Sequence, residues 1–200
     1  MKLLHRPGLY AWSRFDEARN LDFHSYLVCQ PEGNVVIDPL PMSDHDRAHL
    51  HELGGADWVV VTNSDHARAA RNLAQAIGAP IAGPAAEKET FPIDCARWLA
   101  DGDPLPGALS VLALDGSKTP GELALLVGDH TLITGDLVRA HQGGSLSLLP
   151  QGKLRDPAAA RSSLERLVGL SAIEAVLVGD GWPVFRDGHA RLQELLASQH

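Results

Sequence analysis

The sequence predicts an α+β fold in which two β-sheets pack face to face between outer helices, giving four layers. Two stretches with a strand pattern, residues 21–37 and 108–134, are each followed by segments in which strands and helices alternate. The chain has 200 residues, of which 44% are hydrophobic and 21% charged. A chain of this size buries roughly 70% of the surface that it exposes when unfolded. We therefore expect residues 1–200 to form a single domain around this pair of sheets.

The first half of the chain is expected to begin with a hairpin and then to alternate strands with helices. Residues 21–30 are rich in aromatic and β-branched side chains, and turn residues 31–34 separate them from a second strand that ends at Asp38. Ser43 or Asp44 can cap a helix over 44–53, which two glycines end. The other elements expected here are a buried strand over 57–62, a helix over 66–77, and short strands from residue 81 and over 98–103.

The second half is expected to contain a further sheet and two helices. Strands over 122–127 and 130–134 are joined by Gly128-Asp129, a pair that suits a two-residue hairpin turn. The glycine-containing segment 135–152 is expected to be a flexible loop. The other elements expected are a strand over 108–114, a helix over 156–168 with proline in its first turn, a buried strand over 175–178 and a closing helix over 187–197.

Composition and charge exclude several classes of function. The formal net charge is -8 and the basic residues are scattered, which argues against nucleic acid or an anionic membrane as a partner. No apolar run approaches the roughly 18 residues that span a bilayer, and the N-terminus lacks the pattern of a secretory signal. The two cysteines, Cys29 and Cys95, are isolated and indicate a reducing compartment. We expect a cytoplasmic protein with a small-molecule partner.

Polar residues gather at four predicted strand ends, where folds of this type place their sites. The order of these loops resembles the metallo-β-lactamase superfamily, whose motifs are ID-x-G, T-H-x-H-x-D-H, G-H-T-P-G, G-D and G-H-G. The agreement in order and spacing extends from residue 21 to residue 183. The matching pieces are, in order, Ile37-Asp38-Pro39, Thr62-Asn63-Ser64-Asp65-His66-Ala67-Arg68, Ser117-Lys118-Thr119-Pro120-Gly121, Thr134-Gly135-Asp136 and Gly179-Asp180-Gly181.

This resemblance implies a four-layer αββα sandwich with a cleft along one edge of both sheets. In the family two metal ions lie in that cleft, held by the motif histidines and aspartate and bridged by the G-D aspartate. Only the bridging aspartate, Asp136, is kept in this chain, and His66 falls on a position that the family leaves variable. The other six ligand positions carry, in motif order, Asn63, Asp65, Ala67, Arg68, Lys118 and Asp180.

The replaced positions favour a cleft without the zinc pair. Zinc binds imidazole, thiolate or carboxylate, whereas the cations Lys118 and Arg68 repel a divalent metal. We expect these two cations to neutralise the carboxylates of the cleft, with no cofactor. On this hypothesis the protein is a pseudoenzyme or a small-ligand-binding protein. Its candidate catalytic residues are Asp65, Lys118 and Asp136, and its candidate binding residues are Asn63, His66, Arg68 and Asp180.

The alternative hypothesis is a rebuilt metal site. Asp65, His66, Asp136 and Asp180 would together hold a single divalent ion of Mg, Mn, Fe or Zn, because carboxylate-rich sites suit the harder metals. The protein would then be a metal-dependent hydrolase of an ester, a thioester or a phosphodiester. The sequence leaves open the ligand or substrate, the presence of catalytic activity and the oligomeric state.

Overall fold

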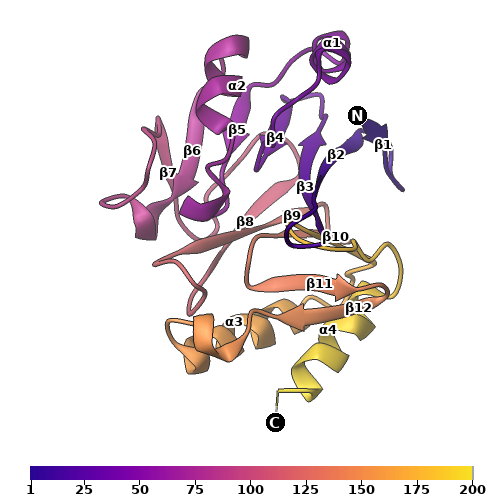
Figure 1. Ribbon diagram of the computed structural model, residues 1–200, viewed down its shortest axis with the longest axis vertical. Helices are drawn as coiled ribbons and strands as arrows, with labels where there is room; N and C mark the ends of the chain where they lie inside the picture. The colour runs from indigo at the N-terminus through magenta and orange to yellow at the C-terminus, as the bar shows by residue number, and fades with distance from the viewer. Residues whose placement is uncertain (200) are drawn as a thin grey trace.

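The computed structural model describes residues 1–199 and places two β-sheets face to face, with helices on both outer sides (Figure 1). The larger sheet holds its seven strands in chain order. Strands β1 to β4 are antiparallel, whereas β4 to β7 run parallel to one another. The bounds are Lys2–Leu3 (β1), Leu9–Asp16 (β2), Leu21–Val28 (β3), Val35–Ile37 (β4), Trp58–Val60 (β5), Ile81–Pro84 (β6) and Arg97–Leu99 (β7).

The smaller sheet has the strand order β13-β10-β9-β8, and its strands β10 and β13 are parallel. Beside it lies a two-stranded sheet of β11 and β12. The bounds are Leu109–Leu114 (β8), Glu122–Val127 (β9), Thr131–Thr134 (β10), Val138–Gln142 (β11), Ser145–Leu148 (β12) and Ala175–Val178 (β13). The helices are Asp44–Glu52 (α1), Ala70–Ile77 (α2), Pro157–Val168 (α3) and Gly188–Ala197 (α4), with 3-10 turns at Ser64–His66, Ala85–Glu87 and Gln151–Lys153.

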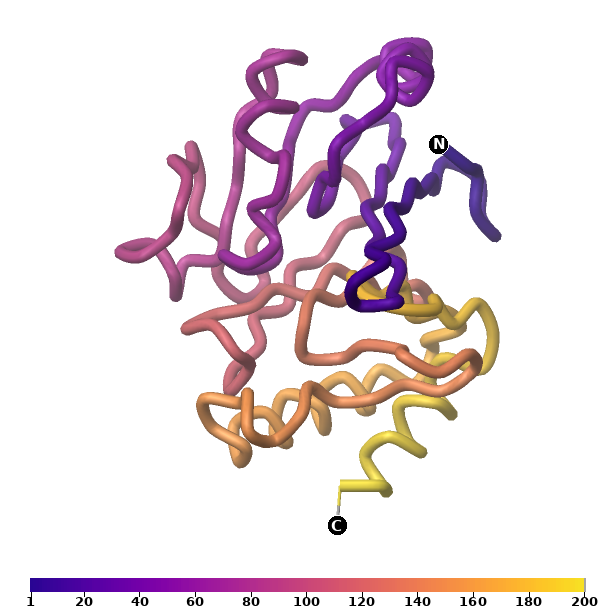
Figure 2. Tube along the Cα trace, in the orientation of Figure 1, coloured from indigo at the N-terminus to yellow at the C-terminus, as the bar shows by residue number. Residues whose placement is uncertain are grey.

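The alternation of side chains along each strand produces the layers. In β4, Ile37 faces the smaller sheet, whereas Val36 packs on the side of α1 and α2. In β10, Ile133 faces the larger sheet, whereas Leu132 packs with residues of α3 and α4. Figure 2 shows that the first half of the chain forms one side of the sandwich and the second half the other. The apolar core therefore has a central layer between the sheets and one layer beneath each helix pair.

Most of the predicted elements are confirmed, including the hairpin of β3 and β4, the strand pair of β9 and β10, and all the helices except part of one. Asp156 caps α3 by accepting hydrogen bonds from two backbone N–H groups, with Pro157 in the first turn. Among the described residues, no helix is long and apolar enough to cross a membrane.

Two predicted segments are wrong. The helix expected over 66–77 is a 3-10 turn followed by α2, because Arg68 lies in the left-handed region at φ 34° and interrupts the helical path. The flexible loop expected over 135–152 contains the paired strands β11 and β12. Val138, Ala140 and Leu146 are buried against the smaller sheet and its helices, and this burial stabilises the pairing. Strand β2 was not among the predicted elements.

The central layer gives a test of the packing. Leu125 of β9 is fully buried between the sheets, so Leu125→Ala removes three side-chain carbon atoms and leaves a cavity. We expect the free energy of unfolding to fall by about 2–5 kcal/mol, measured by urea denaturation. The matched control is Leu3→Ala, because Leu3 is 58% exposed and should change the free energy by under about 0.5 kcal/mol. Equal effects of the two substitutions would contradict this packing.

Candidate functional site

Parallel strands bring the polar loops to one edge of the sandwich. The parallel strands β4 and β5 are followed within two residues by Asp38 and Thr62, and the parallel strands β10 and β13 by Asp136 and Asp180. Because parallel strands end at the same edge of a sheet, each pair places its two polar residues side by side. The sheets are joined near this edge by the Tyr26 hydroxyl, which donates to the carbonyl of Val178 at 2.7 Å.

His66 lies at the centre of the site, and its position is fixed by its neighbours. The Asn63 side chain caps the short 3-10 turn by accepting a hydrogen bond from the backbone N–H of His66 at 3.1 Å. The Nδ1 atom of His66 lies 2.8 Å from Asp38 Oδ2. Asp38 also accepts hydrogen bonds from the backbone N–H and the hydroxyl of Thr62, both at 2.7 Å. The imidazole is therefore oriented by a buried carboxylate, with Nε2 directed away from it.

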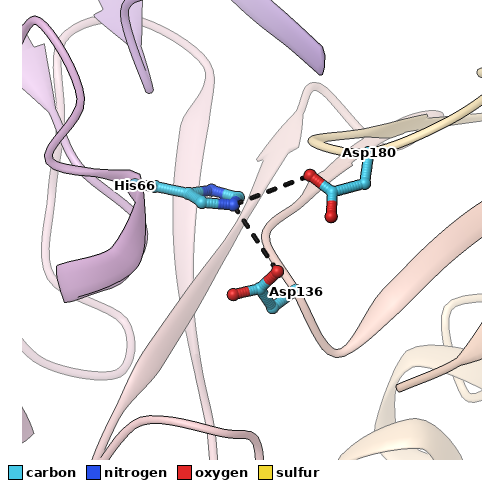
Figure 3. Close-up of side chains that lie close together, drawn as sticks. All are labelled: His66, Asp136 and Asp180. Carbon is cyan, nitrogen blue, oxygen red and sulfur yellow. Dashed lines mark ion pairs between the residues drawn. The ribbon is translucent and has the colours of Figure 1, made fainter. Parts of the chain in front are cut away.

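The Nε2 atom of His66 faces two buried aspartates (Figure 3). It lies 3.6 Å from Asp136 Oδ1 and 3.9 Å from Asp180 Oδ1. One ligand atom from each of these three residues lies within 4.8 Å of the others, which is a spacing that could hold a metal ion. Asp136 Oδ2 and Asp180 Oδ1 are buried and accept no hydrogen bond.

Arg139 joins the two aspartates, and sequence reasoning missed it. Its Nη2 atom donates to Asp136 Oδ1 at 3.1 Å and to Asp180 Oδ2 at 2.9 Å. The side chain is nine-tenths buried and comes from β11, inside the segment that was expected to be a loop. The alternation of buried Val138 and Ala140 around Arg139 was the available signal, but the strand is too short to be distinguished from a loop by pattern alone.

Arg68 and Lys118 bring two further cations. The Arg68 guanidinium donates to the carbonyls of His24 at 2.8 Å and Asp38 at 3.3 Å, and it lies 3.5 Å from Asp180 Oδ1. Lys118 forms an ion pair with Asp65, and its Nζ atom lies 3.5 Å from Asp136 Oδ2.

The structure thus brings Asp136 and Asp180 together with Arg68 and Lys118, as the sequence hypothesis expects. Asp65 is placed differently from the other aspartates. Its side chain is 46% exposed at the rim, and it is not one of the three residues that face one another at the metal spacing. Asn63 is buried beneath the 3-10 turn and does not line the cleft.

Glu122 links two of the loops from behind the site, and no sequence motif pointed to this residue. Its carboxylate accepts a hydrogen bond from the Ser117 hydroxyl at 2.6 Å and from the backbone N–H of Leu137 at 2.9 Å. Burial, together with the charge of Asp136, raises the pKa of Glu122 to about 7. Glu122 therefore helps to position the residues next to its partners, Lys118 and Asp136.

The charges within the site shift the protonation of its members. Burial lowers the pKa of His66, but Asp38 and Asp136 outweigh burial and raise the pKa to about 9. Burial raises the pKa of Asp136, but the hydrogen bond and charge of His66, with Lys118 and Arg139, hold this pKa well below its usual range. Burial lowers the pKa of Lys118, and its contacts with Asp65 and Asp136 more than compensate and raise it. At neutral pH the imidazolium and ammonium are therefore charged and Asp136 is ionised.

A cleft of ≈ 990 Å³ opens over these residues. One side is formed by the turn between β2 and β3, and another by residues of the β11–β12 region and the 3-10 turn that follows it. The lining residues are Asp16, Arg19, Asn20, Leu21, Phe23, Leu40, Asp65, His66, Arg68, Lys118, Asp136, Arg139, His141, Leu149, Lys153 and Asp180.

The zinc pair that the family resemblance implies does not fit this arrangement. Two zinc ions need about three protein ligands each, and the described residues bring together only His66, Asp136 and Asp180 at a metal spacing. The Arg139 guanidinium is already hydrogen-bonded to both carboxylates. Two added divalent ions would also lie close to the cations of Arg68 and Lys118. The donor set is therefore too small and the surroundings too positive for two zinc ions.

Comparisons with known proteins agree with the fold. A family profile described as metallo-beta-lactamase superfamily matches residues 1–199. Similar solved structures include the DIM-1 metallo-beta-lactamase (TM-score 0.75, 15% identity, 98% of this chain and 95% of that chain) and a metallo-beta-lactamase from Pontibacter korlensis (TM-score 0.75, 16% identity, 98% of each chain). A third is the metallo-beta-lactamase FIM-1 from Pseudomonas aeruginosa in its mono-zinc form (TM-score 0.74, 12% identity, 98% of this chain and 93% of that chain). A comparison with curated proteins gives no match.

The raised pKa of His66 predicts how stability depends on pH. The folded-state pKa of about 9 lies above the ordinary value of 6.5. The stabilisation from the imidazolium is therefore fully present below pH 6.5 and is lost as the pH rises through about 9. The pKa of Glu122 is also raised, to about 7. Loss of its proton therefore lowers the stability of the fold as well, mainly in the lower part of the same pH range. We expect the urea midpoint to fall between pH 7 and pH 9.

The control for this dependence is His66→Gln. This variant should have a lower urea midpoint at pH 7, and its midpoint should change less with pH above that value. A titration of the His66 ring by NMR measures the same pKa without relying on the variant. A ring that titrates near its ordinary value of 6.5 would contradict the charge arrangement described here.

Proposed function

This chain belongs to the metallo-β-lactamase superfamily, and we propose that its cleft binds a small molecule without a resident metal ion and without hydrolysing it. The observation that carries the proposal is the Arg139 guanidinium, which is hydrogen-bonded to both Asp136 and Asp180. These are the two buried carboxylates that a metal ion would need. A permanent cation on them supports a site that is complete without a metal.

The balance of charge supports the same proposal. Four carboxylates meet four cations in the site when His66 is protonated: Asp38, Asp65, Asp136 and Asp180 against His66, Arg68, Lys118 and Arg139. Buried charges are stable only when they are paired, and this set is paired within the chain. A divalent ion would add two positive charges, so it would have to displace a proton or a side-chain cation.

The protonation states argue against hydrolysis by the side chains alone. Activation of water needs a base whose pKa lies near the working pH. His66 and Lys118 have raised pKa values and are already protonated, whereas Asp136 has a lowered pKa and is a weak base. Glu122 has a pKa of about 7, but it is buried, already accepts two hydrogen bonds and does not line the cleft. This supports binding over metal-free catalysis.

A second candidate function is hydrolysis of an ester, a thioester or a phosphodiester with a single Mg, Mn, Fe or Zn ion. The observation in its favour is that Asp136 Oδ2 and Asp180 Oδ1 are buried without a hydrogen-bond donor. In addition, Asp38 orients His66 in the way that carboxylates orient metal-bound histidines. His66, Asp136 and Asp180 would hold the ion and supply its Lewis acidity to the substrate. Asp65, proposed as a fourth ligand from the sequence, would have to move inward from the rim.

We further propose a cytoplasmic protein that acts on neither nucleic acid nor membranes. Both cysteines, Cys29 and Cys95, are free thiols, which supports a reducing compartment. The formal net charge of -8 supports the absence of a polyanionic partner.

The two candidate functions differ in metal content. Protein purified without chelator and without added metal should contain well below one ion of Mg, Mn, Fe or Zn per chain by elemental analysis. Stoichiometric metal would reject the proposed function and favour the single-metal hydrolase.

Removal of the internal cation should create a metal site. Arg139→Met keeps a long side chain and removes the charge, so Asp136 and Asp180 lose a shared donor. We expect this variant to have a lower Tm than the wild type. Addition of Mn²⁺ or Zn²⁺ at a concentration of roughly 100 times its Kd should raise the Tm of the variant by about 5–10 °C. The wild type should show no such rise. Arg161→Met is the matched control, because Arg161 pairs with Glu165 on the surface of α3. An unresponsive Arg139→Met variant would contradict the role given to Arg139.

A further inference from the structure

The cleft is more positive than the chain that contains it. The chain carries a formal net charge of -8, yet the cleft lining holds five Lys and Arg side chains against four Asp. His66 is also protonated, because its pKa is raised to about 9, and the charge of Asp38 beside it balances this positive charge. A positively charged cleft attracts anions, whereas the net negative charge of the whole chain repels them.

The cations differ in how far they are already paired. Arg68, Lys118 and Arg139 are engaged with the aspartates of the floor. Lys153, in contrast, is exposed and forms no ion pair with any residue in 1–199 at 4.0 Å or less. Among the same residues, Arg19 forms an ion pair only with Asp16, and its Nε atom lies 3.8 Å from Asp16 Oδ2. Both side chains are exposed, so this pair contributes little to stability. The positive charge that is free for a ligand therefore lies at the mouth.

His141 is a neutral donor at the same mouth. His141 is exposed and lines the cleft from β11. Lys153 lines the same cleft from the 3-10 turn Gln151–Lys153. Burial lowers the pKa of His141, and the charge of Arg139 lowers it further; Asp180 opposes this shift and Lys153 adds to it. His141 and Lys153 both line the cleft from the part of the chain that contains β11, β12 and the 3-10 turn after them. Lysine and imidazole together can donate to one oxyanion.

Apolar side chains also line the cleft. Phe23, Leu21, Leu40 and Leu149 line the cleft beside the charged groups. The guanidinium carbons of Arg19 and Arg68 each lie 5.5 Å from the centre of the Phe23 ring, so this ring contacts two cations. The cleft thus offers an apolar surface for the carbon part of a ligand.

We propose that the ligand of this cleft is a small organic oxyanion, a carboxylate or a phosphate monoester, held by Lys153 and His141 with its apolar part against Phe23. This inference rests on the proposed binding function and names the chemistry of its ligand. Arg19 adds to the attraction from the opposite hairpin turn, and the paired charges of the floor close the inner end of the cleft.

The test is a titration with three probes of similar shape: benzoate, phenyl phosphate and the neutral benzyl alcohol. Binding is measured by calorimetry and by the NMR signals of the His141 ring. At least one of the two anions should bind, weaken with rising ionic strength and raise the pKa of His141, because a bound anion stabilises the imidazolium. The tighter of the two anions identifies the head group. Benzyl alcohol should bind at least about tenfold more weakly.

Two charge reversals complete the test. Lys153→Glu should weaken binding of the anion by about tenfold or more, whereas Lys88→Glu, an equally exposed change outside the cleft, should alter it by less than about twofold. Urea midpoints of both variants check that they are folded. The inference is wrong if neither anion binds, if benzyl alcohol binds as tightly, or if Lys153→Glu has no larger effect than Lys88→Glu. These outcomes are independent of metal content, which separately tests the proposed function.

Discussion

The hydrogen bonds from Arg139 to Asp136 and Asp180 are the interaction on which the site depends. Two carboxylates that are buried at the end of adjacent parallel strands repel each other unless a cation lies between them. Breaking such a buried pair costs about 3–5 kcal/mol, because it leaves a charge without a partner. Arg139 therefore stabilises this edge of the sandwich, and we propose that it also governs what the cleft binds.

The fold explains why the charges accumulate at this edge. Strands β4, β5, β10 and β13 all deliver a polar residue to it, and the two sheets bring these residues face to face. A chain with this architecture must neutralise the carboxylates that it buries at this edge. Here the six replaced ligand positions include two new cations, Arg68 and Lys118, and β11 adds a third in Arg139. Such joint changes are more consistent with a remodelled site than with the loss of a single ligand.

Sequence patterns predicted most strands of the two larger sheets, the helices except the start of α2, and the loops of the site, because these follow from hydrophobic periodicity and from the order of motifs. They did not predict Arg139, because the short strand β11 is stabilised by tertiary burial of Val138 and Ala140. The sequence also could not separate Asp65 from the other aspartates, because that depends on the left-handed conformation of Arg68 and on the 3-10 turn before it. The pairing of His66 with Asp38 joins positions 28 apart, which no local pattern reports.

The central claim is that a guanidinium, and not a metal ion, lies between Asp136 and Asp180. It is tested most directly by a crystal structure of protein grown with Mn²⁺ or Zn²⁺, with anomalous data collected at the absorption edge of that metal. The predicted result is continuous density for Arg139 between the two carboxylates and no anomalous peak beside them. An anomalous peak among His66, Asp136 and Asp180, with Arg139 turned away, would contradict the claim.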